Sequence, residues 1–98
     1  MVINGTPNQL RPVARVKDPK SGRVMTLSAD QPGIQFYTGN FLDGSITGKA
    51  GKPYGKNAGF CLETQHYPDA TNHPNFPTTV LRVGETYNQT TIYKFTTD

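Results

Sequence analysis

One stretch in the middle of the chain combines a carboxylate and an amide with the pattern of a buried strand. Residues 59–65 read Gly-Phe-Cys-Leu-Glu-Thr-Gln, and a loop rich in Pro, Asn and Asp follows over residues 66–77. Alternate side chains of a strand share a face. The apolar face carries Phe60, Leu62 and Thr64, and the other carries Cys61, Glu63 and Gln65. Glu63 is therefore a candidate general base with Gln65 as its hydrogen-bonding neighbour, unless it is simply a solvated residue on an outer face, where charged residues are usually found.

A second segment, Ile34–Thr38, repeats this arrangement after a tight turn at Pro32-Gly33. Gln35 and Tyr37 alternate with apolar positions and share the polar face. If the two segments pair in one sheet, a single surface combines Gln35, Tyr37, Glu63 and Gln65. Such a surface suits a sugar, because amides and carboxylates bind hydroxyls and an aromatic ring covers the apolar C–H face of a pyranose. The alternative is that Gln35 and Tyr37 are ordinary outer-face strand residues.

The remaining elements that must position these residues are also strands. Period-two patterns and turn residues predict a strand over Leu10–Lys17, a hairpin loop over Asp18–Gly22, a return strand over Arg23–Ser28, and later strands over Val80–Arg82 and Thr86–Thr96. Residues 44–59 are rich in Gly and Lys. A phosphate-binding loop needs four residues between its two glycines, but only three separate Gly44 from Gly48 and Gly51 from Gly55. This segment is predicted to be a surface loop. No convincing helix is present, so we expect an all-β chain of five or six mostly antiparallel strands.

Composition limits the class of protein. The chain of 98 residues forms at most one domain, and its hydrophobic content of 34% is low for a compact core. The net charge of +3 comes from scattered Lys and Arg, so no nucleic-acid binding is expected. The single cysteine, Cys61, is expected to be a small buried hydrophobe. No apolar run has transmembrane length and no signal-peptide core is apparent, so we expect no membrane partner and a cytoplasmic location.

The two histidines offer no metal site, because no further ligands stand at suitable spacing. His66 follows the 59–65 segment, but alternation places it on the face opposite Glu63 if the strand extends that far. His73 lies in the Pro-rich loop and is less constrained.

Several segments together resemble the aldose 1-epimerase (galactose mutarotase) family. They are "GFCLETQ" and "HPNFPTT" within residues 59–79, "ARVKDPKSGRVM" over Ala14–Met25, "QPGIQFYTGNFLDG" over Gln31–Gly44, and "TTVLRVGETY" over Thr78–Tyr87. They occur in the family's order and cover nearly the whole chain, from about Asn4 to Phe95. Family members are several times longer, so residues 1–98 resemble only their C-terminal portion. The fold implied is part of the antiparallel galactose-mutarotase-like β-sandwich, or supersandwich.

The resemblance also implies an activity. Family members interconvert the α and β anomers of aldoses such as glucose and galactose by general acid–base ring opening. The family's base is the glutamate of its "LETQ" motif, which matches Glu63, and a sugar-binding glutamine matches Gln35. No metal or organic cofactor is implied.

The family's acid is a histidine of the N-terminal portion, where further sugar-binding residues also lie, and none of those motifs is present here. The chain is therefore expected to be an epimerase portion that is inactive alone, or one part of an active assembly that includes the missing N-terminal portion. The alternative is a non-catalytic β-module that binds carbohydrate or a protein partner. Exposed strand edges are expected to favour self-association.

Overall fold

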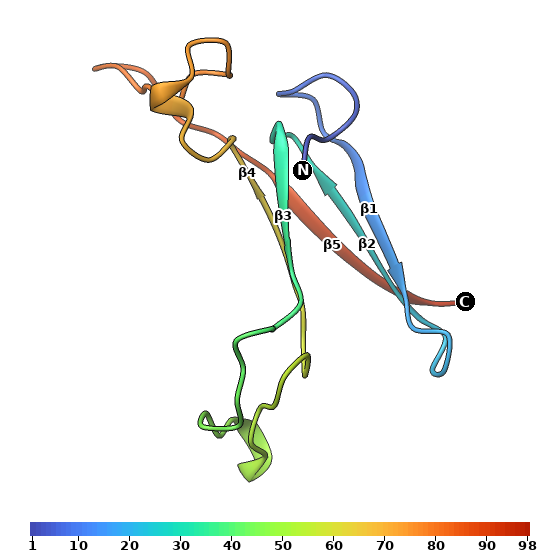
Figure 1. Cartoon of the computed structure of the whole chain (residues 1–98). Helices are drawn as coiled ribbons and strands as arrows, with labels where there is room; N and C mark the ends of the chain where they lie inside the picture. Colours follow the sequence, from blue (N-terminus) through green and yellow to red (C-terminus); the bar gives the residue numbers. More distant parts are fainter.

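The first half of the chain is organised by a β-hairpin. In the computed structural model, which describes residues 1–98, β1 (Arg11–Lys17) and β2 (Arg23–Ala29) pair antiparallel on either side of the turn at residues 18–22. Asp18 shapes the turn by accepting a hydrogen bond of 2.6 Å from the Ser21 hydroxyl, and this bond lowers the pKa of Asp18. The last strand, β5 (Thr91–Thr97), pairs with the other edge of β2 and completes a sheet of order β1-β2-β5 (Figure 1).

The second sheet consists of β3 (Gly33–Tyr37) and β4 (Cys61–Gln65), which are also antiparallel. Only two single turns of 3₁₀-helix occur, η1 (Lys49–Gly51) and η2 (Ala70–Asn72), both in loops. Neither turn, nor any other helical segment, has the length and apolar character of a membrane-spanning helix. The prediction of an all-β chain with antiparallel strands is confirmed.

The two sheets pack face to face near the start of β3. The core between them is small and consists of Ile3, Leu27, Ile34 and Leu62. Two polar contacts join the sheets beside this core. The Tyr93 hydroxyl of β5 donates to the Leu62 carbonyl at 3.0 Å, and the hydroxyls of Thr64 and Thr91 lie 2.7 Å apart. Because Leu62 and Thr64 meet the other sheet, the even-numbered side chains of β3 and β4 form the inner face.

Arg11 fixes the chain where it enters β3. Its guanidinium donates to the carbonyl oxygens of Ala29 and Gln31, both at 3.0 Å. The same side chain also donates to the carbonyls of Asn4 and Gln9. These contacts hold the turn at Pro32-Gly33, so they set the direction in which β3 starts.

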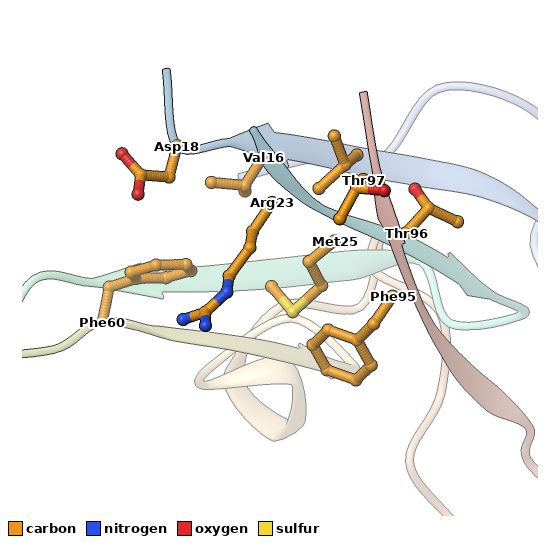
Figure 2. A pocket seen from close by; sticks show the side chains of 9 residues that line it. Val16, Asp18, Arg23, Met25, Phe60, Phe95, Thr96 and Thr97 are labelled. Atoms are coloured by element: carbon orange, nitrogen blue, oxygen red, sulfur yellow. The ribbon is translucent and has the colours of Figure 1, made fainter. Parts of the chain in front are cut away.

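The sheets separate toward the far end of β3 and leave an apolar groove. Figure 2 shows Met25 and Phe95 of one sheet facing the same open space as Phe60, which precedes β4. The groove has a volume of about 710 Å³, and Phe95 is 72% exposed. The Cα radius of gyration is 16.7 Å, whereas a compact domain of this length has a radius of roughly 13 Å. The chain therefore carries more apolar surface than its own fold covers.

Four sequence-based expectations need correction. No strand forms over 80–82, and β5 begins at Thr91 rather than at Thr86. Val80 and Leu81 are exposed and lack a partner strand within the chain. Their backbone groups therefore cannot form the hydrogen bonds of a sheet. Cys61 is exposed rather than buried, because its side chain lies on the outer face of β4. Phe60 lies outside β4 and is half-exposed instead of belonging to the core.

Candidate active site

The register of β3 and β4 places Gln35 directly opposite Glu63. Directly opposed residues of an antiparallel pair have Cβ atoms roughly 4.5–5.5 Å apart. On the same face Gln65 lies opposite Gly33, and Tyr37 lies opposite Cys61. The expectation that the two segments share one sheet is confirmed, and all four proposed site residues lie on one face of it.

This face points away from the β1-β2-β5 sheet. Ile34 and Leu62, which alternate with Gln35 and Glu63, are buried in the core between the sheets. Gln35 and Glu63 are exposed, and neither side chain forms a hydrogen bond or ion pair within the chain. A carboxylate and an amide thus stand side by side with their hydrogen-bonding capacity free for a ligand. The exposure of Glu63 is also what the alternative of a solvated outer-face residue predicts.

Tyr37 closes one end of this face. Its hydroxyl accepts a hydrogen bond of 3.1 Å from the backbone N–H of Phe41, and the two rings stack with centroids 6.4 Å apart. Phe41 was not predicted as a site neighbour, because its position depends on the path of the loop after β3. Tyr37 is half-buried and holds the start of that loop against the sheet.

Tyr67 closes the other end. A Cβ atom added to Gly33 would lie 3.0 Å from Cδ1 of Tyr67, so the tyrosine ring covers the outer face where Gly33 has no side chain. Phe76 packs edge-to-face on Tyr67 with centroids 5.1 Å apart, and His73 stacks on Phe76 at 4.6 Å. The sequence analysis did not single out Tyr67, although it stands four residues after Glu63 and would share a face with Glu63 in a continuous strand.

Both histidines lie in the loop that follows β4, outside the strand pair that carries Gln35 and Glu63. His66 lines a separate cavity with Thr78 and Tyr87. His73 Nε2 lies 3.2 Å from Asp69 Oδ2 and pairs with it when protonated. No three His, Cys, Asp or Glu side chains gather closely enough to hold a metal ion. The face can therefore offer a carboxylate as proton acceptor, amides for hydroxyl groups and aromatic rings at both ends.

Residues 2–94 match the model of the aldose 1-epimerase family, so the chain belongs to this family. It is similar to the galactose mutarotases of Rattus norvegicus and Homo sapiens, each 58% identical over 82 residues, which are 84% of this chain and 24% of the relative. It is also similar to the aldose 1-epimerase of Escherichia coli (strain K12), with 42% identity over 66 residues, 65% of this chain and 19% of that protein. The chain spans about a quarter of the length of the galactose mutarotases it matches. The two antiparallel sheets are consistent with part of a mutarotase β-sandwich.

Proposed function

We propose that the chain supplies the general base and part of the sugar pocket of an aldose 1-epimerase that acts on aldoses such as glucose and galactose. The observation that carries this proposal is the cross-strand pair of Gln35 and Glu63 on the outer face, within a chain of this family. A cytoplasmic location, expected from the sequence, stays a prediction.

In the proposed reaction, a carboxylate oxygen of Glu63 accepts the proton of the anomeric hydroxyl. The C1–O5 bond breaks as a general acid gives a proton to the ring oxygen, and the sugar opens to the aldehyde. Rotation about C1–C2 and reclosure by the reverse proton transfers give the other anomer. Gln35 and Gln65 bind sugar hydroxyls with their amides, and Tyr37 borders the pocket on one side.

We further propose that the acid and the remaining sugar contacts come from the rest of the family fold. The galactose mutarotases that this chain matches are about four times as long as their aligned region. The rest of such a fold is long enough to cover the groove beside Met25, Phe60 and Phe95. Loss of a positioned acid costs roughly 10²–10⁴-fold in rate. The chain alone is therefore expected to accelerate mutarotation barely above the spontaneous rate.

The test is polarimetry of freshly dissolved α-D-galactose and α-D-glucose. The chain is assayed alone and after addition of the N-terminal portion of a family member. Activity is expected only in the complemented sample, and Glu63→Gln is expected to abolish it, because glutamine keeps the shape of glutamate but cannot accept the proton. Glu85→Gln is the matched control, since Glu85 is the only other glutamate and lies in an exposed loop.

Gln35→Ala is expected to weaken sugar binding by about 0.5–1.5 kcal/mol, the value of one neutral hydrogen bond. A complemented Glu63→Gln variant that is as fast as the unsubstituted chain contradicts the base role and favours a non-catalytic binding module. Full activity of the chain alone contradicts the proposal that the acid lies elsewhere.

A further inference from the structure

We infer that Tyr67 forms a wall of the sugar site, on which the apolar C–H face of the pyranose packs while the tyrosine hydroxyl bonds a sugar hydroxyl. This inference rests on the proposed function, because it concerns the same face of β3 and β4. It adds a substrate-contacting residue that lies outside both strands.

The position of the ring follows from Gly33. Cδ1 and Cε1 of Tyr67 lie 3.0 and 3.1 Å from the place that a Cβ atom of residue 33 would take. Residues 33 and 35 point to the same face and are separated by about 7 Å along the strand. The ring is therefore next to the Gln35–Glu63 pair, at a separation that one sugar ring can bridge. A Cβ atom at position 33 would be tighter against the ring than an ordinary contact, so the tyrosine ring would have to shift by a few tenths of an ångström.

The ring is held by neighbours in its own loop. Phe76 supports it edge-to-face, and His73 stacks behind Phe76 while contacting Asp69. A ring fixed in this way loses little freedom when a ligand packs on it, which favours binding. Tyr67 is half-buried, and its hydroxyl makes no hydrogen bond within the chain. An unpaired phenol beside a polar face is free to bond a ligand.

Tyr37 at the opposite end is less suited to this role. Its hydroxyl is already bonded by the Phe41 N–H, and its ring stacks on that of Phe41. Of the two tyrosines that border the face, Tyr67 is thus the one whose hydroxyl is free both to donate and to accept, whereas the Tyr37 oxygen already accepts one hydrogen bond.

The kinetic test uses the complemented assembly described above. Tyr67→Leu is expected to raise KM for galactose about 3- to 10-fold, as loss of one aromatic packing contact implies, and to leave kcat within about twofold. Tyr67→Phe keeps the ring, so it should restore the packing contact and retain only the part of the loss that comes from the hydroxyl's hydrogen bond. Gly33→Ala should raise KM in the unsubstituted chain but have little further effect beside Tyr67→Leu. Tyr54→Leu, in the loop between β3 and β4, is the matched control and should leave KM unchanged.

A binding test without catalysis uses methyl β-D-galactopyranoside, whose ring cannot open. Saturation of the protein's aromatic protons should transfer to the C–H protons of the glycoside in the unsubstituted assembly and in Glu63→Gln. The transfer should fall in Tyr67→Leu and in Gly33→Ala. If Tyr67→Leu changes neither KM nor the saturation transfer while Glu63→Gln is inactive, Tyr67 does not contact the sugar. The proposed function is not affected by that result. A fully active Glu63→Gln variant overturns the proposed function itself.

Discussion

Leu27→Ala tests whether the two sheets depend on the small core between them. Leu27 of β2 is the only large side chain that is completely buried, and it meets Ile34 of β3 and Leu62 of β4 in one cluster. Truncation to alanine removes this contact from the middle of the cluster. We expect the β3-β4 sheet to lose its support against β2.

The expected cost is large compared with the stability of the chain. Leucine-to-alanine substitutions in cores cost roughly 2–5 kcal/mol. A domain of this length has a free energy of unfolding of roughly 5–15 kcal/mol, and a core of four buried residues places this chain near the lower end. The substitution should therefore remove about half of the stability or more.

The assay is urea unfolding followed by far-UV circular dichroism. For a slope between about 1 and 2 kcal/mol/M, the midpoint of the Leu27→Ala variant should fall by at least about 1 M. Leu27→Met keeps the volume and should cost less than about 1.5 kcal/mol, and Val83→Ala, at a fully exposed position, should change stability by less than about 0.5 kcal/mol. If Leu27→Ala costs no more than Val83→Ala, the contact between the sheets does not hold this fold together.

Two further predictions concern the ends of the strands. Asp98 lies 3.2 Å from Lys17 Nζ and 2.8 Å from Arg15 Nη2, and hydrogen bonds from these groups lower the pKa of Asp98. A lowered folded-state pKa gives stability that is present above the ordinary aspartate pKa and is lost as the pH falls through the folded-state value. Asp98→Asn should therefore reduce the urea midpoint at pH 7 but not at pH 2, and equal midpoint changes at both values would contradict the ion pair. Phe95→Lys should reduce concentration-dependent association of the isolated chain in light scattering, because it places a charge in the exposed groove. Val83→Lys is the control and should leave association unchanged. If the unsubstituted chain stays monomeric at high concentration, the groove does not mediate self-association.

The sequence alone determined which side chains share a face. Strand alternation is a local property of the extended backbone, so the positions of Gln35 and Tyr37, and of Glu63 and Gln65, followed from counting residues. The hairpin around Asp18 was equally local, because its turn residues specify the geometry themselves. The pattern also separated Leu62, which is buried, from Glu63, which is not.

Only the tertiary structure decided which strands pair and which surfaces are covered. Val80 and Leu81 have the composition of a strand but find no partner in this chain, and a strand needs a partner for its backbone hydrogen bonds. Cys61 is exposed because nothing in the chain covers the outer face at the start of β4. Tyr67 reaches the face of Glu63 through a loop whose path depends on contacts with Phe76 and Gly33. The contact with Gly33 joins residues far apart in sequence, and the contact with Phe76 depends on the path of an irregular loop, so no strand pattern contains either of them.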